Sequence, residues 1–180
     1  MTFHKLKTKY SRLFTVLFIL ATSLLNMTCF TVKYDFKGGI KIDPRVKTFS
    51  VQYFDNRAQR IEPTLSQRVT DGLKDYIESN TNLKLVTTYG DVDFSGVITD
   101  YKINSTSYTA GDIAAQTKFT ITIKVTYSNL YVPDDDFEES FSKSIEFEST
   151  KDISSVELEY SEDLVDEIIE LIFNKAFINW

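Results

Sequence analysis

The chain has 180 residues, with 20 Lys or Arg, 26 Asp or Glu and one His, so its formal net charge is −6. This acidic balance excludes a nucleic-acid partner, because a phosphate backbone requires a basic protein face. The single histidine, His4, lies close to the start of the chain. If the first residues are removed, Ser-His and Cys-His catalysis and ordinary zinc sites are excluded as well.

Residues 1–28 have the zones of an export signal. Four basic residues (Lys5, Lys7, Lys9 and Arg12) precede an apolar run over residues 13–21. That run is shorter than the roughly 20 residues that a membrane span needs. We therefore expect residues 1–28 to be cleaved as a signal peptide, with an uncleaved membrane anchor as the alternative.

Cys29 follows this signal and is the only cysteine in the chain. It cannot form an internal disulfide, and exported proteins seldom leave a thiol free. The segment resembles a bacterial lipobox, although Thr28 replaces the usual small residue and Leu25 lies four places before the cysteine. We expect Cys29 to carry a covalent lipid such as palmitate at the mature N-terminus. The mature chain, 29–180, would hold 16 basic and 26 acidic residues, a net charge of −10.

Residues 29–44 are expected to be a lipidated tether, because Gly38, Gly39 and Pro44 break regular structure. A strand follows over 46–54 and ends in a turn or loop at 55–57. A helix begins near Pro63, where residues 64–67 fit a capping box. Apolar residues then recur at helical spacing up to residues 79–82, which end the helix: Leu65, Val69, Leu73, Tyr76 and Ile77.

Three or four strands are predicted next, over residues 83–88, 94–105, 118–127 and 137–148. The strand over 118–127 alternates strictly, with Phe119, Ile121, Ile123, Val125 and Tyr127 on one side. Such alternation predicts one buried face and one wet face, as in an antiparallel sheet covered on one side. Asp134, Asp135 and Asp136 follow Pro133 at a turn. They lack the spacing of a calcium loop, so we interpret them as a solvated hairpin tip.

The last predicted element is a helix whose start, residues 154–157, fits a second capping box. Leu164, Ile168 and Ile172 form its apolar stripe, and the apolar end at Trp180 is expected to dock on the domain. Residues 45–180 are thus predicted to form an α+β domain. Its architecture is a two-layer sandwich, a mainly antiparallel sheet of four or five strands with two helices packed on one face.

Five stretches of the mature chain resemble the LptE family of lipopolysaccharide-assembly lipoproteins, in the branch found outside the enterobacteria. They lie in the order expected for the family and span nearly the whole mature chain: residues 46–57, 63–67, 93–101, 137–142 and 172–180. None of the five is a chemical motif, so the resemblance identifies a scaffold and no active site.

The resemblance implies a protein that is not an enzyme, needs no cofactor and sits at the periplasmic face of the outer membrane. Its partner would be the LptD β-barrel, for which it would act as a plug and assembly factor in lipopolysaccharide transport. The alternative is a periplasmic lipoprotein that assists peptidoglycan synthesis or a secretion channel. A hydrolase with two catalytic carboxylates has only the abundance of acidic residues in its favour.

Direct contact with lipopolysaccharide would need cations for its phosphates. Residues 134–170 hold fifteen acidic residues against two lysines and should repel phosphate, so barrel contacts are expected there instead. The candidate cations lie in the N-terminal half, where scattered solvent charges are the alternative interpretation: Arg45, Lys47, Arg57, Arg60 and Arg68.

Overall fold

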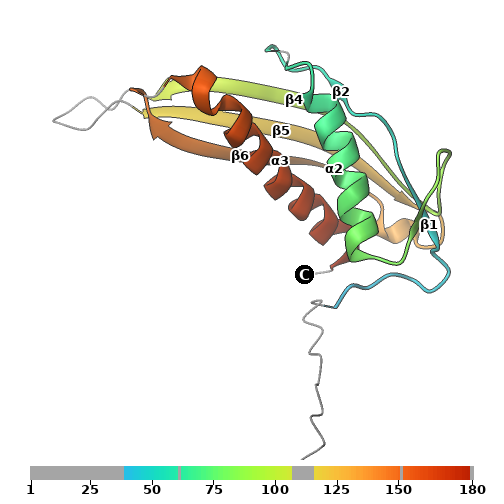
Figure 1. The fold of residues 1–180 in the computed structure, drawn as a ribbon. Helices are drawn as coiled ribbons and strands as arrows, with labels where there is room; N and C mark the ends of the chain where they lie inside the picture. Colours follow the sequence, from blue (N-terminus) through green and yellow to red (C-terminus); the bar gives the residue numbers. More distant parts are fainter. Residues whose placement is uncertain (1–38, 61, 107–115, 151, 179–180) are drawn as a thin grey trace, which may run out of the picture. The chain divides into compact units, whose positions relative to one another are not determined.

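The computed structural model describes residues 39–60, 62–106, 116–150 and 152–178 (Figure 1). All of them belong to the unit formed by Gly38–Trp180. The predicted signal peptide, Cys29, most of the tether and Trp180 lie outside the described residues, so those expectations stay predictions.

Three long strands form a continuous antiparallel meander. They are β4 (Val92–Thr106), β5 (Gln116–Asn129) and β6 (Phe137–Glu148). β5 pairs with β4 along one edge and with β6 along the other. Its buried residues alternate with exposed or half-buried ones, which confirms the pattern predicted for residues 118–127. The turn after β5 contains the short 3-10 helix η1 (Pro133–Asp135), as expected of a hairpin tip.

Three short strands extend the sheet beyond β4 and make it mixed. β1 (Thr48–Val51) pairs in parallel with β4 and with β3 (Lys84–Leu85), and β2 (Asp55–Asn56) pairs in parallel with β4. The prediction of a mainly antiparallel sheet of four or five strands is therefore only partly correct, since the described residues form a mixed sheet of six strands. Parallel neighbours need a crossover connection, and a helix supplies it here.

The segment at Asp55–Asn56 was expected to be a turn, and this expectation is wrong. Asp55 and Asn56 lie beside Val97 and Ile98 of β4, and the Arg57 N–H donates to the Ile98 carbonyl at 2.9 Å. Polar residues are compatible with this position because so short a strand at the margin of a sheet exposes its side chains to water.

A bulge interrupts β4 between Ile98 and Asp100. Before it, Phe94 and Ile98 point into the core. After it, Tyr101 does so, although a regular strand would bury Asp100 instead. The extra residue, Thr99, shifts the alternation by one position. The bulge thereby places the Tyr101 side chain on the buried face of the sheet.

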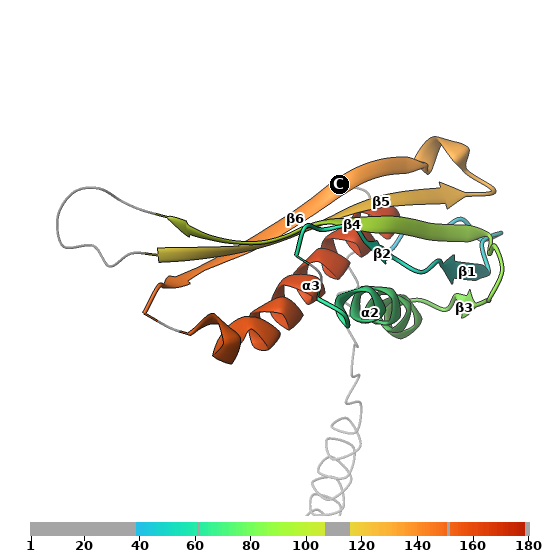
Figure 2. The ribbon, with the colours of Figure 1, turned by 90° about the horizontal axis from the view of Figure 1, so that it is seen from above.

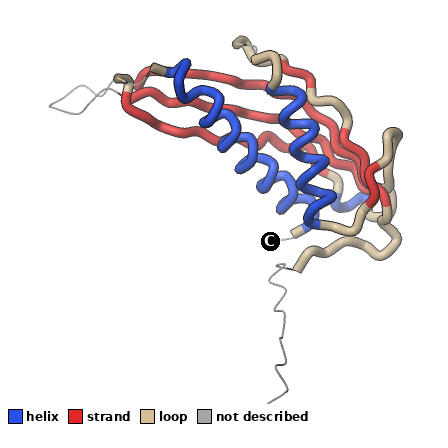
Figure 3. The backbone as a smooth tube through the Cα atoms, viewed as in Figure 1, coloured by secondary structure: helices blue, strands red, loops and turns tan. Residues whose placement is uncertain are grey.

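Two helices cover one face of the sheet, α2 (Leu65–Asn80) and α3 (Ile153–Phe177), and Figure 2 shows both on the same side of the strands. The tube in Figure 3 shows the same two layers. This arrangement confirms the predicted α+β fold with two helices on one face. The opposite face, called here the open face, carries mainly Ser, Thr and charged side chains: Lys118, Thr120, Thr122, Lys124 and Thr126 of β5, beside Glu146, Ser144, Ser142, Ser140 and Glu138 of β6.

The predicted capping boxes do not form. Thr64 is the residue before α2, but its backbone is helical and its hydroxyl donates to Glu62 at 2.7 Å instead of capping the helix. α3 begins earlier than predicted. Asp152 caps it by accepting the Ser154 N–H at 3.1 Å.

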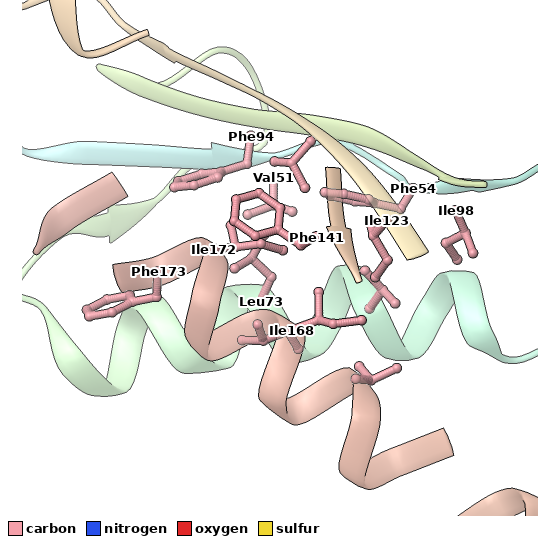
Figure 4. Packing of buried hydrophobic residues seen from close by; sticks show 14 of the residues in the cluster. Val51, Phe54, Leu73, Phe94, Ile98, Ile123, Phe141, Ile168, Ile172 and Phe173 are labelled. Carbon is pink, nitrogen blue, oxygen red and sulfur yellow. The ribbon is translucent and has the colours of Figure 1, made fainter. Parts of the chain in front are cut away.

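The core lies between the helices and the sheet (Figure 4). Leu73 of α2 and Ile168 and Ile172 of α3 are fully buried against Phe94 and Ile123 of the sheet. Removing each such side chain from water contributes roughly 2 kcal/mol. These contacts fix the strand ends and helix starts that carry the polar groups described next.

Candidate functional site

A pocket of about 360 Å³ opens where β4, the start of α3 and the segment before α2 meet. It brings together two of the predicted cations, Arg60 and Arg68. Charged, polar and apolar groups line it: Arg60, Glu62, Pro63, Arg68, Tyr101, Ser154, Glu157, Leu158 and Ser161.

Glu157 connects two sides of this pocket. The hydroxyl of the buried Tyr101 donates to Glu157 Oε1 at 2.7 Å, and Arg60 Nη2 lies 2.8 Å from Glu157 Oε2. Burial, with the Glu157 hydrogen bond, raises the pKa of Tyr101 well above its ordinary value, so the phenol stays neutral and remains a donor. Arg60 is thereby held near the ring of Tyr101, 6.0 Å from its centroid.

Arg68 and Glu62 form the other side. Arg68 donates to Ser161 Oγ at 3.2 Å and lies 3.7 Å from Glu162. Glu62 Oε1 accepts from the N–H and the hydroxyl of Thr64, whereas Glu62 Oε2 is buried and has no donor within the described residues. The pocket therefore offers guanidinium donors, which suit an anionic ligand group, whereas Glu62 Oε2 is buried away from solvent.

The other predicted cations lie elsewhere. Arg45 forms an ion pair with Asp43 at 2.8 Å and lies over the ring of Tyr131, 5.1 Å from its centroid. The hydrogen bond from the Arg45 side chain lowers the pKa of Asp43 to about 2. Lys47 has an exposed side chain, and its backbone N–H donates to Asp91 at 2.8 Å.

Arg57 has the most exposed of the predicted arginine side chains, at 69%, and lies 3.7 Å from Asp55. The Arg57 N–H donates to the carbonyl of Ile98 in β4. The Lys47 N–H donates to the side chain of Asp91, seven residues earlier in the chain. At the rise of a strand these two points are roughly 23 Å apart. The five cations therefore do not form one continuous face: Arg60 and Arg68 share the pocket, whereas Arg57 does not line it and Arg45 and Lys47 lie elsewhere.

The sequence reasoning missed the partners of these arginines. Nothing in the spacing of Glu62, Tyr101, Glu157 and Ser161 marks them as neighbours, because they come from three separate segments. Of these four residues, only Tyr101 could have been recognised from the sequence as facing inward. It follows Ile98 by three places in a strand that otherwise alternates every two, which indicates the bulge that turns it inward.

The aspartates at the hairpin tip line a second, larger pocket of about 570 Å³ together with Lys41 and Lys175. Within the described ranges, no three or more His, Cys, Asp or Glu side chains are grouped in a way that could hold a metal ion. No helix in the same ranges is both long and apolar enough to cross a bilayer.

Solved structures with a related backbone include two bacterial lipoproteins. A minor lipoprotein from Acinetobacter baumannii is 12% identical with a TM-score of 0.48, and the match covers 72% of this chain and 91% of that one. Uncharacterized lipoprotein B from Nitrosomonas europaea is 11% identical with a TM-score of 0.47, covering 75% and 88%. A hypothetical protein from Chlamydia trachomatis is 9% identical with a TM-score of 0.48, covering 74% and 99%. At these scores none of the three supports a function for this chain.

A search of curated proteins gave no match. The sequence profile described as LptE, lipopolysaccharide-assembly, matches residues 46–176, which is well over half of the chain. This match covers every helix and strand of the domain except the last residue of α3. The chain therefore belongs to the LptE family of lipopolysaccharide-assembly proteins.

Proposed function

We propose that this protein is a non-enzymatic, lipid-anchored partner of an LptD-type β-barrel and helps to deliver lipopolysaccharide to the cell surface. The observation that carries the proposal is the family match over residues 46–176. The LptE family has no known cofactor, and the role proposed here requires none.

The polar open face supports a role inside or against a barrel. Barrel lumens are polar, and a face of Ser, Thr and paired charges can meet such a wall without burying unpaired apolar surface. Cross-strand contacts already hold this face in order, since Thr122 and Ser142 share a hydrogen bond of 3.0 Å and Lys124 pairs with Glu138 at 2.5 Å. A lipid on Cys29 would confine the domain to the periplasmic face of the outer membrane, where the barrel resides. Stable anchoring requires more than one acyl chain.

Co-purification tests the partner. The full-length chain with a C-terminal affinity tag is expressed in its own bacterium, extracted in detergent and captured. A large β-barrel should be recovered in a fixed ratio to the tagged chain. Recovery of a penicillin-binding protein or a secretion ring, without a barrel, would instead favour the alternative role in peptidoglycan synthesis or secretion.

We further propose that lipopolysaccharide contacts Arg60 and Arg68 in their shared pocket and the exposed Arg57, with Arg45 and Lys47 as a second, separate contact. The pocket beside Arg60 and Arg68 suits a phosphate group of lipopolysaccharide, because phosphate accepts hydrogen bonds from guanidinium.

Charge reversal tests this contact. Arg57→Glu with Arg60→Glu should weaken lipopolysaccharide binding at least about tenfold, since charge-assisted hydrogen bonds are each worth about 1.5–3 kcal/mol. The matched control is Lys41→Glu with Lys84→Glu, which changes the net charge equally at exposed positions. Unchanged binding in the arginine variant, or an equal loss in the control, would overturn the contact.

The anchor has a separate test. The mass of the mature N-terminus should correspond to an acylated Cys29 as the first residue. An unmodified cysteine at that position, or a chain that retains residues 1–28, would contradict the lipid anchor and leave the barrel partnership to be judged by co-purification.

A further inference from the structure

β6 is a long strand that is paired along one edge only. All twelve residues from Phe137 to Glu148 lie opposite residues of β5. β6 is the last strand in the sheet order, and no strand among the described residues pairs with its other edge. Figures 1 and 3 show it at the margin of the sheet. Its outer N–H and C=O groups therefore form an open template for another strand.

A groove of about 520 Å³ runs beside this outer edge. It is lined by four consecutive residues of β6, Glu139–Ser142, and by Leu171, Asn174 and Lys175 of α3. Consecutive strand residues point to opposite faces. A groove that touches four in a row must therefore follow the edge of the strand, where the main chain is exposed, and not either face alone.

The walls of this groove suit an extended peptide. Phe141 and the half-buried Leu171 provide an apolar floor. The Asn174 side chain makes no hydrogen bond within the described ranges, so its amide is available to a peptide group. Lys175 and Glu139, 3.0 Å apart, join the strand to the helix at one end, and both side chains are about half exposed.

The charges of β6 disfavour a second copy of the same chain. Four glutamates and one lysine lie along the strand, at residues 138, 139, 146, 148 and 143. A symmetric antiparallel pairing centred on Ser142 would place Glu138 of each copy opposite Glu146 of the other. Like charges directly opposite each other destabilise a strand pair. Glu138 and Glu146 face Lys124 and Lys118 of β5 on one side and remain about half exposed, so a strand carrying Lys or Arg at those positions would bring a second cation to each.

We propose that the outer edge of β6 binds an extended, basic segment of a partner protein as a seventh strand. Main-chain hydrogen bonds provide the affinity in this mode of recognition, and alternate side chains provide the specificity. One side of the segment places an apolar residue against Phe141 and Leu171. The other side continues the open face and sets its cations beside Glu138 and Glu146. This docking site goes beyond the proposed function, because it depends neither on lipopolysaccharide nor on the lipid anchor.

Hydrogen–deuterium exchange tests the site on the full-length chain in detergent micelles. The probe is a synthetic ten-residue peptide that alternates lysine with valine. At saturating peptide, amides within residues 137–148 should exchange at least about tenfold more slowly, because formerly free N–H groups become bonded. The same peptide with methyl groups on alternate backbone nitrogens cannot complete the ladder and should leave their exchange unchanged.

A pair of variants tests the charge argument. Glu146→Lys should raise the dissociation constant of the lysine–valine peptide at least about threefold, since it reverses an attraction at the edge. Glu78→Lys on α2 is the matched control, because it changes the net charge equally at an exposed position far from β6 in the sequence. The control should stay within about twofold of the wild type. Equal unfolding midpoints of the two variants would show that Glu146→Lys has not disturbed the fold.

Three results would overturn the proposal. The peptide could give no protection at residues 137–148, or the methylated peptide could protect them equally. Protection of residues 137–148 could also rise with protein concentration in the absence of peptide, which would assign the edge to a second copy of the chain.

Discussion

Gly96 lies where β4 closely approaches the backbone of β5 and the ring of Phe54. A Cβ at this position would meet the Lys124 carbonyl oxygen and come within 2.6 Å of the Phe54 ring. Backbone and a fully buried ring have little room to move, so even a methyl group overpacks the site. Gly39, by contrast, has no atom within 4 Å of such a Cβ.

We expect Gly96→Ala to lower the free energy of unfolding by about 2 kcal/mol, the usual cost of overpacking a core. Gly39→Ala should change it by less than about 0.5 kcal/mol, as at most exposed sites. Urea denaturation of both variants measures the difference. Equal effects at the two positions would contradict the close approach of β4 to β5.

Tyr127 supplies a prediction about pH. Burial raises its pKa from 10.0 to about 12. Its phenol therefore stays protonated in the folded chain at a pH where it ionises in the unfolded one. The resulting stabilisation is complete below pH 10 and is lost as the pH rises to about 12. Tyr127→Phe should show a shallower fall in unfolding free energy over this range, measured by urea denaturation at several pH values. Identical slopes would show that Tyr127 does not titrate as described.

The burial of single residues was predictable where buried positions recur with a simple period. The inward side of β5, from Phe119 to Tyr127, follows from alternation alone. The environment of Arg60 was not predictable, because the position of Glu157 beside Tyr101 depends on how α3 crosses the sheet. The residues around Arg60 in the sequence do not indicate where α3 crosses the sheet.

At the scale of elements, the start of α3 depends on one carboxylate. Asp152 accepts the N–H and the hydroxyl of Ser154, and the hydroxyl bond in particular lowers the pKa of Asp152. A cap of this kind satisfies a helix-end N–H that would otherwise lack a partner.

We expect Asp152→Ala to lower the free energy of unfolding by about 1 kcal/mol through loss of this cap. Thr64→Ala at the start of α2 should cost clearly less, because the Thr64 hydroxyl caps nothing. Thermal and urea unfolding of the two variants provide the comparison. A larger loss for Thr64→Ala would support the capping box that the sequence suggested.

Elements were predictable in proportion to their length. β6 has the bounds expected from its pattern, and β4 and β5 extend only one or two residues beyond theirs at each end. The segment of β2 was predicted to be a turn or loop, and β3 was predicted to be longer than it is. Two residues carry too little periodicity to define a strand. Parallel pairing was missed for another reason. Alternation reveals which side of a strand is buried but not which way its neighbour runs.

For the whole molecule, the balance of charge is the main electrostatic feature. Acidic residues crowd α3 and β6, and partial burial, followed by the neighbouring charges of Asp163 and Glu162, raises the pKa of Asp166. Repulsion among like charges opposes the compact state, and added salt screens it.

We therefore expect the urea midpoint to rise between about 20 mM and about 300 mM NaCl, by an amount worth roughly 1 kcal/mol. Asp166→Asn should raise the midpoint at low salt and reduce its dependence on salt, because it removes a carboxylate that its neighbours disfavour. Asp55→Asn, also exposed but on β2, is the control for loss of one negative charge. A midpoint that falls with salt would mean that the ion pairs outweigh the repulsion.

The bulge at Thr99 also limits how this domain can vary. In the part of the β4–β5 pair beyond the bulge, which contains Tyr101 and Phe119, the face to which each β4 side chain points depends on the extra residue Thr99. Adding or removing one residue on either arm would turn every later side chain to the opposite face and carry Tyr101 or Phe119 into water. Adding or removing two would leave each face as it is. Among natural relatives, the arms of this hairpin should therefore differ in length by even numbers of residues, unless a second bulge restores the count.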